Sequence, residues 1–274
     1  MEIHFLDVGH GNMQVILLPD GGIFVYDCHI EDGRENYVLS YLDKIIGSRT
    51  PIDAFINSHR DAGRMRGIKE LHKKHRIKSI WDSGVHGRNP KSQEYRDYMS
   101  MLCIIPLKVI KPGTFREYGN AVLRFFNSTW EDYSDPADQS IVMKIEYKDT
   151  SVMLAGDTTF KPWKEKILPQ FGRDSLLSST VLLAPSHGAL SFFDDPSDPK
   201  YYFTSHMEKI SPVLTLVSVG PNAQGLPHSK ALELYDMHSI GSTTGNKVYT
   251  TAERGTMKLE VKREGGWVLK KKQW

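Results

Sequence analysis

The 274-residue chain has few cysteines and no long hydrophobic run. Cys28 and Cys103 lie far apart and form no CxxC motif, so the sequence predicts neither a disulfide framework nor a zinc site made of cysteines. No apolar segment approaches the length that crosses a bilayer, and the residues after Met1 lack the basic and apolar regions of a signal peptide. We therefore expect a soluble, cytoplasmic protein with no membrane partner.

A strong charge of one sign is also absent. The chain has 35 Lys and Arg residues against 33 Asp and Glu residues, and the resulting formal charge of +2 predicts neither a nucleic-acid-binding surface nor an acidic tail. Basic residues gather only towards the C-terminus, where we favour a solvated hairpin over a surface that guides a nucleic-acid backbone. They are Lys258, Lys262, Arg263, Lys270, Lys271 and Lys272.

Apolar residues make up 39% of the chain, enough for a sizeable core, and they favour one large α/β domain over residues 1–274 rather than two small domains. Short apolar runs between turn signals predict strands, and apolar spacing of three and four predicts helices. Strands are expected at 3–8, 13–18, 22–26, up to 56, 79–82, 107–110, 121–126, as a pair within 140–155, and at 180–184, 214–219, 248–251, 256–262 and 267–271. Helices are expected at 36–46, 65–75, 93–102, 161–168, 201–209 and 229–238.

Two β-rich halves that each carry helices predict two packed sheets with helices on the outer faces. Between them, the polar segment 127–139 is expected to form a long exposed loop.

Histidine and aspartate follow several of the expected strands. His59 and Asp61 come after an apolar strand, and alternate residues of an extended chain share a face, so both side chains can point at one cation. Asp157 and His187 also follow buried strands, where a carboxylate is costly unless it is paired or coordinates a cation. We expect these four side chains to converge at one rim of the sandwich.

Several segments, in order, resemble metallo-β-lactamase-type hydrolases, in particular the soluble domain of the ComEC/Rec2 DNA-uptake proteins. Residues 5–12 (FLDVGHGN) resemble the family's opening FLDVGQGD, and 58–67 (SHRDAGRMRG) resemble THxDxDHxGG. Further similar segments are 24–28, 139–143, 152–157, 183–188 and 217–228. The resemblance covers nearly the whole chain and implies a four-layer αββα metallo-β-lactamase-like sandwich.

The resemblance also implies an incomplete metal site. The intact family site holds two cations that polarise the substrate and supply a hydroxide. By correspondence, Gly63 and Arg64 replace two ligands, while Ser186 and Leu226 each replace a histidine. At most one divalent metal is expected, zinc in preference to manganese, or none. Its candidate ligands are His59, Asp61, Asp157 and His187, with Asp138, His86 or His228 available to complete the shell.

The function that this resemblance implies is a metal-dependent phosphodiesterase or nuclease acting on nucleic acid or a nucleotide. Asp61 and Arg64 would be catalytic, with Arg64 stabilising charge on the phosphate oxygens. Arg64, Arg66 and His228 would contact substrate. Arg60, Arg64 and Arg66 could instead bind phosphate without turnover, or simply decorate an exposed helix.

The alternative is a catalytically inactive subunit that uses the same scaffold to recognise nucleic acid or a partner protein. The missing ligands motivate it, and the aromatic-rich segment 191–203 could supply contact area. The chain has no Gly-x-Ser-x-Gly elbow and no phosphate-binding P-loop, so a serine hydrolase and a P-loop nucleotide hydrolase are both disfavoured.

Overall fold

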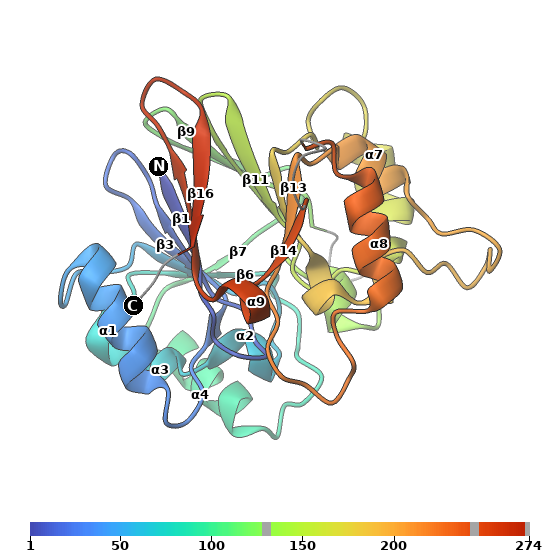
Figure 1. The fold of residues 1–274 in the computed structure, drawn as a ribbon. Helices are drawn as coiled ribbons and strands as arrows, with labels where there is room; N and C mark the ends of the chain where they lie inside the picture. Colours follow the sequence, from blue (N-terminus) through green and yellow to red (C-terminus); the bar gives the residue numbers. More distant parts are fainter. Residues whose placement is uncertain (128–132, 242–246, 272–274) are drawn as a thin grey trace.

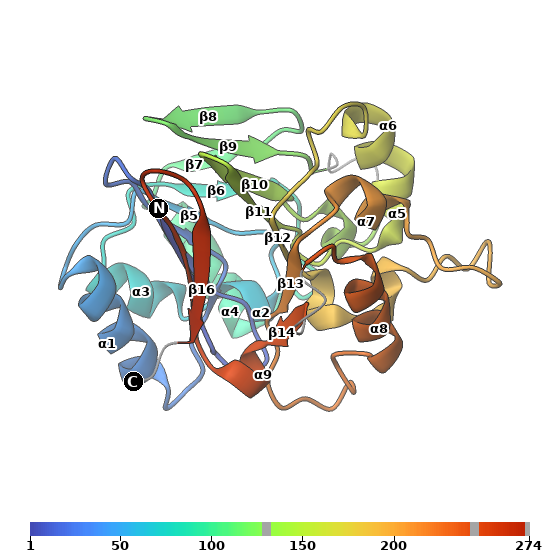
Figure 2. The same cartoon turned by 45° about the horizontal axis from the view of Figure 1, so that its top comes forward.

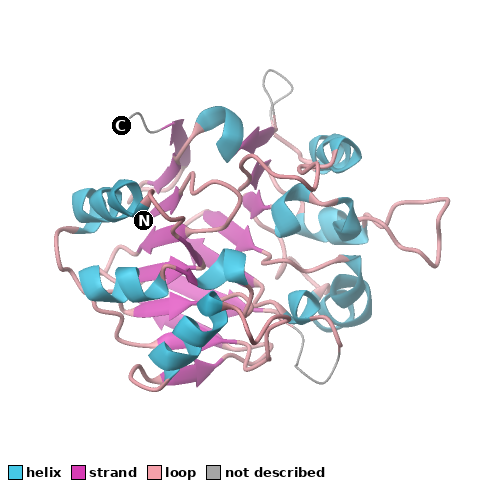
Figure 3. Cartoon of the chain, turned by 90° about the horizontal axis from the view of Figure 1, so that it is seen from below, coloured by secondary structure: helices cyan, strands magenta, loops and turns pink. Residues whose placement is uncertain are grey.

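Two mixed β-sheets pack face to face, and helices cover both outer faces (Figure 1). The computed structural model describes residues 1–127, 133–241 and 247–271. The layer order confirms the expected αββα sandwich. Figure 3 shows the helices on either side of the strands. No helix within these ranges is both long and apolar enough to span a membrane.

Among the described residues, the first sheet has eight strands in the order β16-β15-β1-β2-β3-β5-β6-β7. Strands β1 to β3 form the expected antiparallel meander, whereas β3, β5, β6 and β7 run parallel because helices connect them. The bounds are β1 Glu2–Phe5, β2 Gln14–Leu17, β3 Ile23–Tyr26, β5 Ala54–Ile56, β6 Ile80–Asp82, β7 Leu107–Val109, β15 Met257–Val261 and β16 Trp267–Lys271.

The second sheet, within the described ranges, has seven strands in the order β14-β13-β12-β11-β10-β9-β8. Strands β8 to β11 are antiparallel, and β11 to β14 are parallel with helical connections. The bounds are β8 Phe115–Tyr118, β9 Ala121–Phe125, β10 Met143–Tyr147, β11 Thr150–Leu154, β12 Val181–Leu183, β13 Leu214–Val217 and β14 Val248–Thr250. A two-residue strand, β4 (Cys28–His29), bridges to the segment after His59.

Each sheet has its own set of covering helices, whose apolar faces form separate clusters with the outward side chains of that sheet. On the eight-stranded sheet lie α1 (Glu35–Ile46), α2 (Ala62–Met65), α3 (Ile68–Lys74) and α4 (Gln93–Leu102). On the other lie α5 (Phe160–Pro162), η2 (Trp163–Ile167), α6 (Leu168–Phe171), η4 (Leu190–Phe192), α7 (Ser205–Ile210) and α8 (Ser229–His238). Short turns η1 (Pro136–Gln139), η3 (Pro185–Gly188) and α9 (Thr251–Arg254) complete the described elements.

A third cluster fills the space between the sheets and joins them. Phe5 and Tyr26 from one sheet and Phe125 and Leu216 from the other are all fully buried in it. Burying each such side chain contributes about 1.5–3 kcal/mol. The Tyr26 hydroxyl also donates a hydrogen bond of 2.6 Å to the Ile141 carbonyl, across the two halves of the sandwich.

Several sequence expectations need correction. The expected helix 65–75 is two helices, because Arg66 is extended and Gly67 has a φ of +82° between them. The exposed strand β8 was not expected, since its residues show no apolar alternation. In the expected exposed loop 127–139, residues 128–132 lie outside the described residues, and Ala137, Asp138 and Gln139 are buried.

The basic C-terminal group is partly neutralised. Lys258 Nζ lies 2.7 Å from a carboxylate oxygen of Glu2, and Lys270 Nζ lies 2.9 Å from one of Glu260. These two lysines therefore form ion pairs with carboxylates on the surface made by β1, β15 and β16. Lys272 lies outside the described residues.

Candidate functional site

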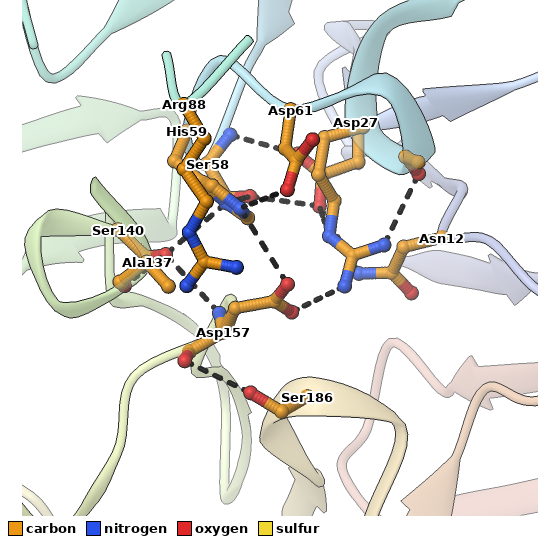
Figure 4. A network of polar contacts seen from close by, with 12 residues as sticks. Asn12, Asp27, Ser58, His59, Asp61, Arg88, Ala137, Ser140, Asp157 and Ser186 are labelled. Atoms are coloured by element: carbon orange, nitrogen blue, oxygen red, sulfur yellow. Dashed lines mark hydrogen bonds and ion pairs between the residues drawn. The ribbon is translucent and has the colours of Figure 1, made fainter. Parts of the chain in front are cut away.

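The ends of several strands meet at one rim between the two sheets. His59 follows β5 of the eight-stranded sheet, Asp157 follows β11, and His187 follows β12. Figure 4 shows His59, Asp61 and Asp157 turned towards one another. His59 Nε2 lies 3.5 Å from Asp157 Oδ2 and 3.9 Å from Asp61 Oδ2. The expected convergence of these side chains is therefore present in the structure.

Arg64 occupies the middle of this cluster. Its side chain extends from α2, is 2% exposed, and donates from Nη2 to Asp157 Oδ1 and to His187 Nε2, the latter at 3.0 Å. Its Nε lies 3.5 Å from Asp27 Oδ2. Arg64 is thus a buried cation with two carboxylates and an imidazole around it, and the interpretation that it decorates an exposed helix is wrong.

Asp27 forms the floor beneath Arg64. Its backbone has a φ of +57°, a conformation that aspartate tolerates better than most residues. Its carboxylate accepts hydrogen bonds from Ser58 N at 2.7 Å, Ser58 Oγ at 3.0 Å and Asn12 Nδ2 at 3.1 Å. Complete burial raises the pKa of Asp27 to about 7, against the opposing effect of Arg64. Asp27 therefore anchors the loops that carry Asn12 and Ser58 and also faces Arg64.

The hydrogen bonds of His187 define its tautomer. Arginine can only donate, so Nε2 of His187 must accept from Arg64, and Nδ1 must donate to the Ser218 carbonyl at 2.7 Å. Burial, followed by the charge of Arg64, lowers the pKa of His187 to about 3. The ring of His10 lies against it, with 4.3 Å between centroids. His187 is therefore a neutral acceptor for the guanidinium.

His59 presents a different tautomer. Its Nδ1 lies 3.1 Å from Ser58 Oγ and 3.2 Å from Ser140 Oγ. Both hydroxyls already donate elsewhere, to Asp27 and to the Ala137 carbonyl, so each accepts from Nδ1–H. Nε2 then carries a lone pair, is buried, and has no hydrogen-bond partner in the part of the chain that the structure describes. Burial lowers the pKa of His59, which favours this neutral form.

Asp157 links the two histidines through Arg64. Burial, the largest single effect, would raise the pKa of its carboxyl, but the charge and hydrogen bond of Arg64, together with His59 and His187, outweigh burial and hold this pKa well below its usual range. Its backbone N–H donates to Ser140 Oγ at 3.1 Å, and its carbonyl accepts from Ser186 Oγ at 2.9 Å. The negative charge of Asp157 is thus already compensated by the guanidinium of Arg64.

These donors do not fit a two-cation centre. Within the part of the chain that the structure describes, no group of three or more His, Cys, Asp or Glu side chains has the spacing of a metal site. Arg64 takes up one carboxylate oxygen of Asp157 and the only acceptor nitrogen of His187. What remains is the unpartnered Nε2 of His59, facing single oxygens of Asp61 and Asp157.

A second arginine stands at the outer side of the cluster. Arg88 lies in the connection between β6 and α4, and its Nη2 approaches the two carboxylate oxygens of Asp135 at 2.6 and 2.5 Å. Figure 4 draws its side chain beside His59. The carboxylates of Asp61 and Asp157 also contribute to raising the pKa of Arg88, behind the Asp135 hydrogen bond. No sequence motif marked Arg88.

The other two arginines of the motif have separate partners. Arg60 is buried and lies 2.9 Å from Asp82, to which Tyr98 also donates a hydrogen bond. Arg66 lies 2.8 Å from Glu94 of α4. Neither contact involves the cluster around Arg64.

The remaining candidate residues also have defined contacts. His228 caps α8 by accepting from Lys230 N, and His86 Nδ1 lies 3.4 Å from the Tyr95 hydroxyl. Asp138 accepts from both the N–H and the hydroxyl of Thr159.

The aromatic segment 191–203 is only partly available for contacts. Phe192 and Phe193 are fully buried beneath α7 and α8, whereas Tyr201 and Tyr202 are 72% and 40% exposed. The tyrosines are therefore the part of this segment that a partner could reach.

Sequence reasoning missed the hydroxyls that orient the site. Ser58 and Ser140 fix the ring of His59, and Ser140 also holds the backbone of Asp157. Their only signal was their position, since Ser58 precedes His59 and Ser140 belongs to a segment that resembles the family.

Comparisons with known proteins agree with this architecture. The family model described as the metallo-β-lactamase superfamily matches residues 6–218. A search of curated protein sequences gives no match. Among solved structures, the chain is similar to the metallo-β-lactamase fold protein YhfI from Bacillus subtilis, with 13% identity, coverage of 93% of this chain and 99% of that one, and a TM-score of 0.55.

Two further structures are comparably similar. Igni18, a metallo hydrolase from the archaeon Ignicoccus hospitalis, has 11% identity, coverage of 96% and 100%, and a TM-score of 0.54. CmlA, a diiron β-hydroxylase from Streptomyces venezuelae, has 14% identity and a TM-score of 0.57, covering 95% of this chain but 54% of CmlA. At these identities the likeness concerns the fold alone. Because the family model matches well over half of its length, the chain belongs to the metallo-β-lactamase superfamily.

Proposed function

We propose that this chain is a catalytically silent member of the superfamily that acts by binding nucleic acid or a partner protein. The observation that carries the proposal is the position of Arg64, a buried guanidinium held by Asp27, Asp157 and His187. A fixed positive charge satisfies carboxylates that would otherwise be buried without a counter-charge.

The chemistry of arginine supports a silent site. Hydrolysis in metal enzymes depends on a cation that binds water and lowers its pKa. A guanidinium has donors but no open coordination position, and it keeps its own proton at all physiological pH values. Arg64 is also 2% exposed with its charge compensated, so it offers little attraction to an incoming phosphate.

Metal content and hydrolysis test the proposal together. Protein purified without added metal is expected to hold substoichiometric zinc, manganese and iron by elemental analysis. It is expected to leave bis(p-nitrophenyl) phosphate and single-stranded DNA uncleaved, with or without added zinc or manganese. Cleavage that is lost in both His59→Ala and Asp157→Ala proteins would overturn the proposal.

A second candidate function rests on the lone pair of His59. Its Nε2 is buried, has no hydrogen-bond partner among the described residues, and faces Asp61 and Asp157. These residue types suit a single divalent metal, zinc before manganese, although the three side chains would have to move closer together to hold it. Such a metal would supply a water for attack on a phosphodiester. Arg64 would hold Asp157 in place and Arg88 would stand at the outer side of the site.

Metal binding separates the two candidates without an activity assay. If the second candidate holds, zinc or manganese raises the melting temperature of the wild-type protein, and His59→Ala abolishes the increase. If the first holds, both proteins respond to metal equally. His72→Ala serves as a matched control, because this half-buried histidine lies on α3 and bonds the Ile77 N–H.

A further inference from the structure

The two sheets leave neighbouring edge strands open on one side of the sandwich (Figure 2). Strand β7 pairs only with β6, and β8 pairs only with β9, among the described strands. The chain passes from β7 to β8 in five residues, 110–114, so the two edges lie close together. We call the segment 104–118 the open edge.

The backbone of β7 has hydrogen-bonding groups to offer. The Pro106 carbonyl accepts from Ile80 N, and Ile110 N donates to the Asp82 carbonyl, so alternate residues face β6. By the same alternation, the N–H and C=O groups of Leu107 and Val109 point away from the sheet. A row of this kind is a template for one more strand.

The side chains of β7 are apolar on one face and basic on the other. Leu107 and Val109 are 41% and 48% exposed, and Ile104 just before them is 68% exposed. Lys108 points the opposite way, with Nζ 4.7 Å above the Trp81 ring. Partial burial and the neighbouring charge of Arg116 on β8 lower the pKa of Lys108. Lys108 lies opposite Trp81 and Arg116 lies opposite Leu123, and both partners belong to the cluster between the sheets, so the two cations border the gap between the edges.

These cations have no acidic partner. Within residues 1–127, 133–241 and 247–271, no ion pair joins Lys108, Lys111 or Arg116 to a carboxylate. In a symmetric pairing centred on β7, a second copy of the chain would bring Lys108 against its own counterpart, and a lysine on an edge strand disfavours such self-pairing. A segment with carboxylates on one face would meet a complementary charge.

We propose that the open edge binds an extended acidic segment of a partner protein, which adds as a strand beside β7. Its apolar side chains pack on Leu107 and Val109, and its alternate acidic side chains face Lys108 and Arg116. This mode of recognition takes affinity from main-chain hydrogen bonds and specificity from alternate side chains. It deepens the proposed binding role by naming the partner class, and it does not involve the cluster around Arg64.

The probe is a fluorescent peptide of alternating glutamate and valine, titrated with the full chain and followed by anisotropy. The double variant Lys108→Glu, Arg116→Glu is expected to bind it at least roughly tenfold more weakly, a loss of about 1.4 kcal/mol. The matched control Lys73→Glu changes an exposed lysine on α3 and is expected to bind as the wild type does.

Changes in the peptide keep the test independent of protein folding. N-methylation of alternate peptide nitrogens removes strand hydrogen bonds and is expected to abolish binding. A lysine and valine peptide is expected to bind the double variant but not the wild type. The proposal is overturned if the acidic peptide does not bind, if N-methylation has no effect, or if oligothymidylate competes for the same edge more strongly than the peptide. Metal content and hydrolysis do not enter this test, so its failure leaves the catalytically silent assignment to be decided separately.

Discussion

Arg64 shows how a single residue can take over the electrostatic part of a metal centre. The carboxylate of Asp27 is fully buried, that of Asp157 is largely buried, and both approach the same guanidinium. Two buried acids without a counter-charge would be costly, and the neutral ring of His187 provides only an acceptor. The stability of this rim therefore depends on one side chain.

Replacing Arg64 by methionine should be strongly destabilising. The substitution keeps much of the aliphatic stem but leaves Asp157 without its counter-charge, and breaking a buried pair in this way costs about 3–5 kcal/mol. The free energy of unfolding from urea titrations measures the loss. Arg76→Met, at an exposed position with no ion pair among the described residues, is the control and should stay within about 0.5 kcal/mol of wild type. Equal losses in the two variants would contradict this account of Arg64.

His206 gives a prediction on pH dependence away from the site. Its ring is buried among aromatic side chains and contacts the Phe192 carbonyl at 2.8 Å, and burial lowers its pKa to about 3. The unfolded chain, with an ordinary histidine pKa near 6.5, therefore binds a proton before the folded chain does. This contribution to stability is complete above about pH 6.5 and is lost towards pH 3, by up to about 1.4 kcal/mol per pH unit.

Unfolding titrations of the wild type and His206→Gln between pH 7 and pH 4 isolate this effect. Glutamine keeps an N–H donor but takes up no proton, so the stability of the variant should fall less steeply below pH 6.5. The other titrating groups are common to both proteins and cancel in the difference. Parallel pH curves for the two proteins would rule out the proposed role of His206.

At the level of elements, the break after α2 keeps Arg64 on a short helix that is separate from α3. Gly67 permits the break, with a φ of +82° and an ideal Cβ position only 2.5 Å from Ile30 Cβ. Any larger residue would clash there as well as strain the backbone. The expectation of one continuous helix failed because apolar spacing does not report this close approach.

Replacing Gly67 by alanine should therefore reduce stability more than replacing a glycine that also has a positive φ but has no atoms near its Cβ position. Gly33 is that control, because its φ is +84° in the tight turn closed by Arg34 N and the Glu31 carbonyl, and no described atom lies within 4 Å of its Cβ position. Gly33→Ala should lose about 1–2 kcal/mol from the left-handed conformation alone. Gly67→Ala should lose a further 1–3 kcal/mol or so from overpacking against Ile30. Thermal unfolding of both variants gives the difference, and equal values would exclude the steric contribution.

The sequence was most informative about elements with strong apolar patterns and caps. The expected helices 93–102 and 229–238 and the strand 267–271 agree with the observed bounds. β8 was missed because its exposed edge position imposes no alternation, as the exposed Phe115 illustrates. The helix expected at 201–209 begins later, at Ser205, because the tyrosines before it are exposed and irregular.

The site was predictable only in part, for a related reason. Strand ends brought His59, Asp61 and Asp157 together as expected, since topology fixes where parallel strands finish. The contacts of Arg64 and Arg88 depend instead on side-chain direction and on connections between elements. Spacing in the sequence carries no information on either.

At the level of the whole molecule, the rim that holds Arg64 exists only while both sheets are assembled. The buried cluster between the sheets draws on strands from each, and Tyr26 bonds across them. We therefore expect residues 1–274 to unfold as a single cooperative unit, which is what one shared core implies.

Hydrogen exchange measured peptide by peptide tests this expectation. The slowest amides of β2 and β11, which belong to different sheets, should report the same free energy of opening, and both should equal the global value. The calorimetric and van't Hoff enthalpies should also agree. A difference of more than about 1 kcal/mol between the two strands would indicate two separable domains.

The pairing of β1 with β15 has a consequence for synthesis. Glu2 lies opposite Glu260, so the backbone hydrogen bonds on this side of β1 can form only after β15 has been synthesised. At a ribosomal rate of about 5–20 residues per second, that interval lasts roughly 10–50 s. During this time the nascent meander exposes an unpaired flank, a place where chaperones would be expected to engage and where premature release would favour aggregation.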